Sequence, residues 1–346
     1  MNAMQVKAAV HYQPGEGVEI EMLDLEQPRE HEVRVRYVAS GVCHSDLHHI
    51  QGLVPHPTPV VFGHEGAGIV EAVGPDVSGV QVGDHVVTSY IPSCGRCYYC
   101  TIGRPNLCEL RDRPRYLLLD GTSRFRKGNQ DVFQYLQLGT YAEMATVPDV
   151  SVIPIRKDAP LEVVCLVSCG VMTGAGSVIN RAQVKPGSTV AVFGCGGIGL
   201  NAIQAAALVG AAKIVAVDVF DQKLEWAKEF GATHTVNARQ VDDPVAAVKQ
   251  ICGRDGADYA IEAVGIQQTI GAGISLDSSR WNGSDDRRPT RGYAPVDRSD
   301  TPAPGADPDR HELRQHTPAP RPTHARGHVH GRAIQTARAH QPRGRA

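Results

Sequence analysis

Four cysteines in one short segment form the strongest chemical pattern of the sequence. Cys94, Cys97, Cys100 and Cys108 follow a C-x2-C-x2-C-x7-C spacing in SCGRCYYCTIGRPNLCE. Thiols this close together let a loop wrap around a tetrahedral ion, at roughly 2.3 Å for each zinc–sulfur bond. Zinc is favoured, and an iron–sulfur cluster is the alternative. Four thiolates close the coordination shell, so the spacing predicts a site that stabilises the fold and takes no substrate.

A second set of reactive side chains is spread along the chain. Cys43 lies in GVCHSDLHHIQG, His64 in VVFGHEGAG and Cys169 in VSCGVMTG. Each cysteine alone is more often a small buried side chain than a ligand. A catalytic zinc needs three protein ligands from separate loops and an open fourth position. The glycine-flanked segments suit such loops, although spacing alone does not show that they converge.

A glycine-rich turn follows in the second half of the chain. Gly194, Gly196 and Gly199 form G-x-G-x-x-G in TVAVFGCGGIGLNAIQAAALVG, between an expected strand and an expected helix. Such glycines permit a tight turn and a close approach of a pyrophosphate to the helix N-terminus. Asp218 ends the next expected strand, where a carboxylate accepts from a ribose 2'-hydroxyl and repels a 2'-phosphate. The pattern predicts NAD in preference to NADP.

The pattern of apolar residues around these motifs changes along the chain. Up to about residue 160, short apolar alternations such as EVRVRYVAS, AGIVEAVG and GDHVVTSY predict a mostly β domain. From about residue 170, TVAVFG, KIVAVDV and ADYAIEAVG read as strands, and LNAIQAAALVG and DQKLEWAKEFGA read as helices. Strands that alternate with helices predict a parallel sheet with crossover helices.

A segment of a third composition begins near Ile266 and runs to Ala346. It is dense in Arg, Pro, His, Ala, Gly and Asp, and it contains no Lys, Cys, Phe or Met. The segment has no helical or strand periodicity, so its composition predicts disorder. We interpret it as a reading-frame slip in a GC-rich gene; the alternative is a natural basic tail that contacts nucleic acid.

Length and charge exclude several classes of protein. The chain has 346 residues, which suit two domains, and its 35 basic and 37 acidic residues give a net charge of -2. It therefore has no whole-chain attraction to nucleic acid or to an anionic membrane, and neither is expected as a partner. There is no run of 18 apolar residues and no signal-like N-terminus. A cytoplasmic protein is predicted, with its nine cysteines as metal ligands or free thiols.

Taken in order, the motifs resemble the zinc-dependent alcohol dehydrogenases of the medium-chain dehydrogenase/reductase superfamily. The similarity spans residues 4 to about 265, through GVCHSDLHHIQG, GHEGAGIVEAVG, the cysteine segment, DGTSRF, SCGVMTG and GCGGIG. The four-cysteine segment together with DGTSRF is similar to the liver-type, formaldehyde-dehydrogenase-like branch. The resemblance implies an α/β plus mostly-β fold: a GroES-like β catalytic domain over 1–170, an incomplete Rossmann doubly wound parallel sheet over 171–265, and an irregular tail over 266–346.

The resemblance also assigns the metal ligands. Cys43, His64 and Cys169 match the ligands of the catalytic zinc, and Glu65 matches a nearby carboxylate that can approach the metal. Asp46 matches an acid that orients the ligand histidine; such partners fix the tautomer and raise ligand basicity. Together with the four-cysteine site, this implies two zinc ions per chain.

The proton path and the cofactor contacts follow by the same comparison. Ser45 matches the hydroxyl that takes the proton of the alcohol, and His48 matches the base that passes it to solvent through the cofactor ribose. His44 occupies a place near the pyrophosphate where many relatives have an arginine. The remaining implied cofactor contacts are Thr173, Gly194, Cys195, Gly196, Gly197, Ile198, Gly199, Asp218 and Lys223.

Some reactive side chains are not assigned as metal ligands by the resemblance. His49 is expected to be a solvated loop residue. Cys165, Cys195 and Cys252 are expected to be small core thiols without a ligand role.

The implied activity is the interconversion of a primary alcohol and an aldehyde with zinc and NAD. The alternatives are a thiol-dependent formaldehyde dehydrogenase and a non-catalytic zinc-binding remnant. After Gly265 no further strands of the family are recognisable, and a half-built sheet has an unpaired strand edge. We therefore expect weak NAD binding and poor solubility. The homo-oligomer of the family is not assured, because its interface tends to use those strands.

Overall fold

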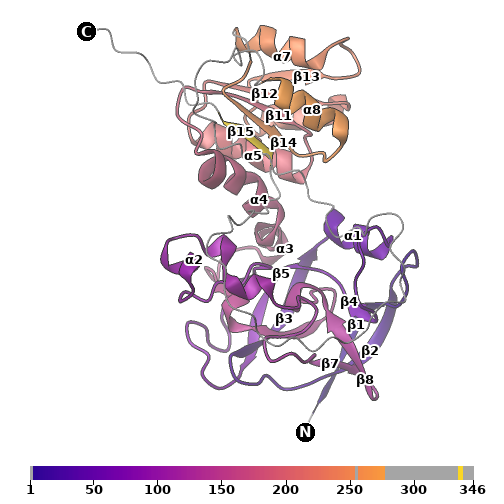
Figure 1. Cartoon of the computed structure of the whole chain (residues 1–346). Coiled ribbons are helices and arrows are strands. Elements are labelled where there is room, and N and C mark those ends of the chain that lie inside the picture. The colour runs from indigo at the N-terminus through magenta and orange to yellow at the C-terminus, as the bar shows by residue number, and fades with distance from the viewer. Residues whose placement is uncertain (1–2, 254–255, 277–333, 338–346) are drawn as a thin grey trace, which may run out of the picture. The chain divides into compact units, whose positions relative to one another are not determined.

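A closed barrel of five strands forms one part of the first half of the chain. This computed structural model describes residues 3–253, 256–276 and 334–337, and it divides into two compact units between Met172 and Thr173 (Figure 1). The barrel order is β1-β2-β7-β8-β4, and alternate residues of its strands face a core that includes Val6, Leu23 and Phe125. The strands are β1 (Met4–His11), β2 (Glu19–Leu25), β4 (Val60–Val61), β7 (Phe125–Lys127) and β8 (Gln130–Gln134).

A five-stranded antiparallel sheet completes the first unit and positions two of the chemical segments. Its order is β10-β6-β5-β3-β9, and its strands are β3 (Glu32–Gly41), β5 (Glu65–Val73), β6 (His85–Thr88), β9 (Met144–Pro148) and β10 (Val152–Pro154). Gly41 at the end of β3 pairs with Glu65 at the start of β5. The segments after β3 and before β5 therefore lie at the same end of the sheet. The predicted strands EVRVRYVAS, AGIVEAVG and GDHVVTSY are confirmed.

Short helices carry most of the remaining site residues of the first unit. They are α1 (His44–Ile50), α2 (Tyr98–Thr101) and α3 (Leu161–Val164), with 3-10 turns at Pro105–Leu107, Glu109–Asp112, Tyr135–Gln137, Asp149–Ser151 and Cys165–Ser168. The helix α4 (Gly170–Gly176) follows and continues as a π-helical turn over Ser177–Ala182. In the described part of the chain no single helix is long and apolar enough to span a membrane; by length and composition alone, the pair Leu161–Ser168 and Gly170–Ala182, bent by 52°, passes that test.

The second unit is a sheet with helices on both faces. Its order is β13-β12-β11-β14-β15, from β11 (Thr189–Phe193), β12 (Lys213–Asp218), β13 (His234–Asn237), β14 (Tyr259–Glu262) and β15 (Ile334–Ala337). Strands β11 to β14 are parallel. The helices are α5 (Gly197–Leu208), α6 (Asp221–Glu229), α7 (Pro244–Cys252) and α8 (Gln267–Ser275) (Figure 1).

Alternation along β11 explains why both faces of this sheet are covered. Val190 and Val192 pack into a core with Ile203 of α5 and Leu224 of α6. The intervening Ala191 and Phe193 belong to a second core, which includes Val248 and Cys252 of α7 and Ala272 of α8. A strand buried on both sides reads as a continuous apolar run, as TVAVF does. The predicted Rossmann-like doubly wound arrangement is confirmed.

Two predictions about the segment after residue 265 need correction. Residues 267–275 form α8, which packs on β14 through Ala272, so regular structure continues past the predicted limit. Its two glycines lower the helical propensity of QQTIGAGIS. Contact with the sheet therefore stabilises this helix where the local sequence does not. The edge of β14 was predicted to be unpaired, yet β15 pairs with it antiparallel, from Tyr259↔Ala337 to Glu262↔Ile334. Residues 277–333 and 338–346, which were also predicted to be irregular, lie outside those that the structure describes.

Candidate functional site

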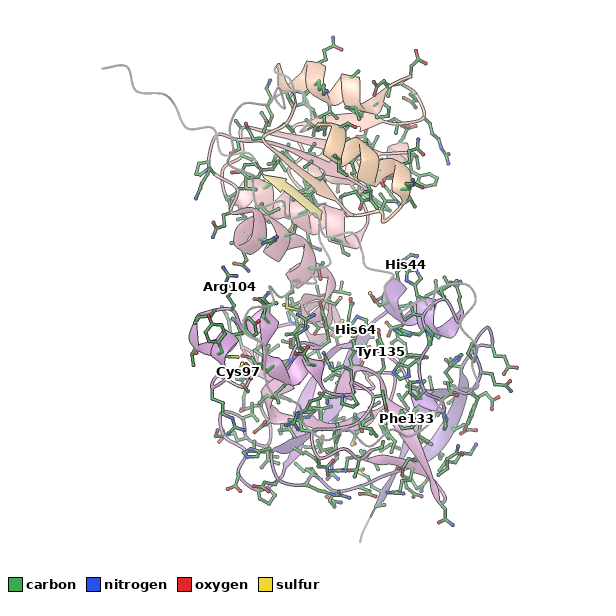
Figure 2. The ribbon with its side chains drawn as sticks, in the orientation of Figure 1. His44, His64, Cys97, Arg104, Phe133 and Tyr135 are labelled. Atoms are coloured by element: carbon green, nitrogen blue, oxygen red, sulfur yellow. The ribbon has the colours of Figure 1, made fainter. Side chains whose placement is uncertain are left out.

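Four side chains from three distant segments converge in the first unit. The ligand-type atoms of Cys43, His64, Glu65 and Cys169 all lie within 4.8 Å of one another. His64, Glu65 and Cys169 are buried, and Cys43 is partly exposed. Figure 2 shows His64 in the interior of this unit, near Tyr135. The convergence that spacing could not show is therefore present in the fold.

Local helix capping fixes Cys43. It is the N-cap of α1, with extended backbone angles (φ -110°, ψ 150°), and its sulfur accepts from the Ser45 backbone N–H at 3.5 Å. The Cys43 backbone N–H donates to Asp46 Oδ2 at 3.2 Å, which completes a capping box. The helix start therefore presents the sulfur and places Asp46 one turn away.

Asp46 in turn holds His64. Asp46 Oδ1 accepts from His64 Nδ1 at 3.1 Å and from the Gly63 backbone N–H at 3.0 Å. Asp46 Oδ2 also accepts from the Tyr141 hydroxyl at 3.1 Å. With Nδ1 engaged, Nε2 of His64 is the nitrogen left for a ligand, and it is buried without a hydrogen-bond partner among the described residues. A buried nitrogen of this kind is costly unless something binds it.

The electrostatics of the cluster favour a thiolate at Cys43. A hydrogen bond from Cys169 is the main cause that lowers the pKa of the Cys43 thiol to about 3, against the effect of burial. Burial opposes protonation of His64, but Asp46 and Cys43 outweigh it and raise the pKa of His64 to about 9. Burial, followed by the Cys43 charge, raises the pKa of Glu65. A thiolate is thus stabilised where a cation would bind.

One glycine keeps the Glu65 carboxylate in place. A Cβ at Gly41 would lie 2.0 Å from Glu65 Oε2 and 2.9 Å from Leu166 Cδ2, and real Cβ atoms do not approach other atoms so closely. Gly41 pairs directly with Glu65 across the β3–β5 ladder. Any side chain at Gly41 would therefore displace the carboxylate.

The four-cysteine segment also folds into a compact cluster. Its sulfur atoms, from Cys94, Cys97, Cys100 and Cys108, lie within 4.8 Å of one another, and Cys97 is the N-cap of α2 (Figure 2). The Cys97 and Cys94 backbone N–H groups donate to sulfur at 3.3 and 3.4 Å. A hydrogen bond from the Glu109 backbone is the largest cause that lowers the pKa of Cys97 to about 6. Burial raises the pKa of Cys108 to about 12. A coordinated cation would deprotonate all four thiols.

Helix α1 also places the residues predicted for the proton path. Ser45 and His48 are half-buried, and the exposed His44 has its ring 5.7 Å from that of His48, measured between centroids. The expectation for His49 is wrong, because His49 is half-buried and its ring packs 4.9 Å from that of Tyr135. His49 also lies on the inward side of a helix that spacing alone had read as a loop.

Some residues near the cluster were not predicted. The rings of Tyr90 and Tyr135 meet the His64 ring edge-on at 5.6 and 5.5 Å, and burial with the Asp46 charge raises the pKa of Tyr141. These tyrosines carry no spacing signal, because they reach the site from segments distant in the chain. The expected core thiols Cys165, Cys195 and Cys252 are all buried.

The glycine turn of the second unit has the expected local geometry. Gly194 follows β11 with φ +88°, and its Cβ would lie 2.6 Å from Val264 Cγ2. A Cβ at Gly199 would lie 1.8 Å from the Gly194 carbonyl oxygen, which explains this glycine as a packing requirement. Gly196 caps α5, and both it and Gly197 face open space, with no heavy atom within 4 Å of an added Cβ. The open side leaves room for a ligand at the helix N-terminus.

Asp218 closes the turn at the end of β12. Its Oδ2 accepts from the Cys195 backbone N–H at 2.8 Å, and its Oδ1 accepts from the Val219 and Phe220 backbone N–H groups at 2.7 and 3.1 Å. Lys223 Nζ lies 4.0 Å from Oδ2. Ile198 is half-buried in the first turn of α5, and Thr173 is half-buried in α4.

The donor sets fit zinc. Two thiolate sulfurs, one imidazole nitrogen and a carboxylate are ligands that zinc accepts, and the buried Nε2 of His64 would gain a partner. Four cysteine sulfurs are the donor set of a closed structural site.

Comparison with known proteins agrees with these features. Residues 29–157 match the family model of the alcohol dehydrogenase GroES-like domain, and residues 197–278 match that of zinc-binding dehydrogenases. The structure of an alcohol dehydrogenase zinc-binding domain protein from Burkholderia ambifaria is 39% identical, with a TM-score of 0.76 over 80% of this chain and 75% of that one. Benzyl alcohol dehydrogenase from Acinetobacter calcoaceticus is 37% identical, with a TM-score of 0.73 over 79% and 74%. An NAD-dependent alcohol dehydrogenase is 30% identical, with a TM-score of 0.63 over 78% and 74%.

Proposed function

The chain belongs to the zinc-type alcohol dehydrogenases of the medium-chain dehydrogenase/reductase superfamily, and from this premise we propose that it interconverts a primary alcohol and an aldehyde with NAD. The observation that carries the proposal is the buried cluster of Cys43, His64, Glu65 and Cys169, in which Asp46 holds the histidine. When bound, zinc supplies Lewis acidity that lowers the pKa of an alcohol hydroxyl. NAD supplies the hydride acceptor.

The residues of the chain have separate roles in this proposal. Cys43, His64 and Cys169 hold the catalytic zinc, and Glu65 is a carboxylate within reach of the same ion. Ser45 accepts the substrate proton at Oγ and gives up its own hydroxyl proton, and His48 passes that proton to solvent. The cysteines of the second cluster hold a structural zinc.

The dinucleotide part of the proposal rests on the second unit. The N-terminus of α5, with Gly196 and Gly197 open to solvent, binds the pyrophosphate. Asp218 accepts from the ribose 2'-hydroxyl, and Lys223 contacts the same ribose. His44 and Thr173 are the further proposed cofactor contacts.

We propose an aromatic primary alcohol as the preferred substrate. The relative at 37% identity is a benzyl alcohol dehydrogenase.

One experiment tests the proposal. Zinc content and NADH formation are measured on the 346-residue chain with ethanol, butanol, benzyl alcohol and, with and without a low-molecular-weight thiol, formaldehyde. We expect bound zinc and NADH formation, with the highest kcat/KM for benzyl alcohol. Turnover of formaldehyde only with thiol would favour a thiol-dependent formaldehyde dehydrogenase. Bound zinc without NADH formation from any substrate would contradict the proposal and favour a non-catalytic zinc protein.

A further inference from the structure

A buried carboxylate with a full set of hydrogen-bond donors lies directly behind His64. The Asp46 side chain is only 1% exposed. Its Oδ1 accepts from His64 Nδ1 at 3.1 Å and from the Gly63 backbone N–H at 3.0 Å. Its Oδ2 accepts from the Cys43 backbone N–H at 3.2 Å and from the Tyr141 hydroxyl at 3.1 Å. A carboxylate has about four lone-pair sites, so these four donors saturate it.

The Tyr141 hydroxyl differs in kind from the other three donors. Two of them are backbone N–H groups, and the third belongs to the ring of His64, a proposed zinc ligand. Of the four donors, the hydroxyl is therefore the one that a substitution can remove without a change to the backbone or to the proposed ligand set.

The fold directs the Tyr141 hydroxyl to Asp46. The Tyr141 backbone N–H donates to the Phe62 carbonyl at 3.0 Å. The Tyr141 ring lies against Gly63, where an added Cβ would be 2.5 Å from Tyr141 Cδ1. The hydroxyl also lies 3.4 Å from the Gly41 carbonyl oxygen. Its single proton bonds more strongly to the nearer acceptor, because that acceptor is charged.

Donors that share one carboxylate compete for its negative charge. A carboxylate behind a ligand histidine raises the basicity of that ligand, and hydrogen bonds in a buried network polarise one another. The Tyr141 hydroxyl draws charge towards Asp46 Oδ2 and away from the bond between Oδ1 and His64. Loss of the hydroxyl should therefore strengthen that bond and make His64 more basic at Nε2.

We propose that Tyr141 is a positioning residue that limits how strongly the Asp46 carboxylate polarises His64. The inference rests on the proposed zinc site, for which His64 Nε2 is the nitrogen left for the metal. It goes further, because it makes the electron donation of that ligand depend on a hydroxyl outside the proposed ligand set. A less basic histidine leaves more Lewis acidity to a bound zinc ion.

Proton NMR of the full-length chain loaded with Co²⁺ in place of zinc tests the proposal. His64 is the only histidine in the two candidate metal clusters of the described residues, so its Nδ1–H should give the one exchangeable resonance that cobalt shifts far from the normal range. In Tyr141→Phe this proton should exchange more slowly with solvent, because its hydrogen bond is stronger. The affinity for Co²⁺, measured by competition with a chelator, should rise about threefold or more, in the direction expected for a more basic ligand.

A matched control and a graded variant make the result decisive. Tyr37→Phe removes a buried hydroxyl of β3 that has no hydrogen-bond partner among the described residues, and it should leave the exchange rate and the affinity unchanged. Replacement of Tyr141 by 3-fluorotyrosine makes the hydroxyl more acidic and hence a stronger donor to Asp46. It should therefore shift both measurements in the direction opposite to Tyr141→Phe, and because it keeps the hydroxyl it decides the question even where Tyr141→Phe is unstable.

Three results would overturn the inference. The first is faster exchange and weaker Co²⁺ binding in Tyr141→Phe, which would show that the hydroxyl only holds the site together. The second is an effect of Tyr141→Phe no larger than that of Tyr37→Phe, or an effect of 3-fluorotyrosine in the same direction as that of Tyr141→Phe. The third is absence of the shifted resonance in the wild-type chain, which would remove the proposed metal site itself and is thereby distinguishable from the other two.

Discussion

Asp46 connects more of the candidate site than any ligand does. Through two oxygens it receives hydrogen bonds from the backbone of Cys43, the ring of His64 and the hydroxyl of Tyr141. A carboxylate behind a ligand histidine fixes its tautomer and strengthens it as a ligand. The position of two proposed metal ligands therefore depends on a residue outside the proposed ligand set.

Asp46→Asn should weaken zinc binding at this cluster about 10- to 100-fold. The amide removes the charge and turns one acceptor into a donor that faces other donors. Competition with a chromogenic chelator measures the affinity. Asp158→Asn is the matched control, because Asp158 is an exposed carboxylate paired only with exposed Arg156. Equal zinc affinity in wild type and Asp46→Asn would refute the role.

Gly41→Ala should disturb the cluster from the strand side. The new Cβ would lie 2.0 Å from Glu65 Oε2, so Glu65 or Leu166 must move, at a cost of about 1–3 kcal/mol for overpacking. The midpoint temperature of thermal unfolding and the affinity for zinc should both fall. Gly17→Ala is the control, because no atom lies within 4 Å of its added Cβ. Identical behaviour of the two variants would show that Gly41 is not required.

The sequence predicted residues of the site whose chemistry is local. The four-cysteine cluster was recognisable because its spacing is typical of a metal site, and its sulfurs do converge. Gly41 and Tyr141 were not recognisable, because the demand on them comes from Glu65 and Asp46 across the fold. Contacts between segments distant in the chain leave no periodic pattern in the sequence.

At the scale of elements, a buried ion-pair network joins the start of β3 to the loop before β7. The Arg124 side chain is 0% exposed and donates to Glu32 Oε1 and Oε2 at 2.6 and 2.8 Å and to Asp120 Oδ2 at 2.6 Å. Burial opposes ionisation of Asp120, but hydrogen bonds from Arg124 and Thr122 outweigh it and lower the pKa of Asp120 to about 2. The loop is thus held by charges that acid can remove.

The network predicts a loss of stability in acid. A carboxylate with a lowered folded pKa stabilises the fold above its unfolded pKa of 3.8, and this contribution is lost as the pH falls from there towards 2. Asp120→Asn should therefore lower the unfolding midpoint at pH 5, and its curve should meet that of wild type near pH 2. Thermal unfolding from pH 5 to 2 measures this. Asp112→Asn, at an exposed site, should follow wild type throughout, and a constant gap for Asp120→Asn would contradict the assignment.

Strands and helices were predicted correctly where the apolar periodicity and the length of the segment indicate the same type of element. The runs TVAVF and KIVAVD are buried strands, as their continuous apolar character indicates. The helix α8 was missed, because QQTIGAGIS combines weak helix formers and its helix is stabilised by packing on β14. Such tertiary stabilisation is absent from any local pattern.

At the scale of the whole molecule, the residues proposed for metal binding and most of those proposed for nucleotide binding belong to different units, with His44 of the first unit as a proposed cofactor contact. Every sulfur, nitrogen and carboxylate of the two candidate metal clusters lies before Thr173, whereas the glycine turn and Asp218 lie after it. Each unit also has its own apolar core. Metal binding and nucleotide binding are therefore expected to be separable within one chain.

Zinc removal should act on one unit and spare the other. Metal binding to thiolates contributes directly to folding, by about 10 kcal/mol or more in small zinc domains. A chelator should lower the unfolding midpoint of the first unit, seen by calorimetry as a transition that separates from that of the second. The affinity for 5'-AMP should stay within about twofold, because independent sites contribute additively. Added zinc should restore the first transition and magnesium should not, since thiolates select zinc over magnesium. Loss of 5'-AMP binding together with zinc would show instead that the two units unfold as one.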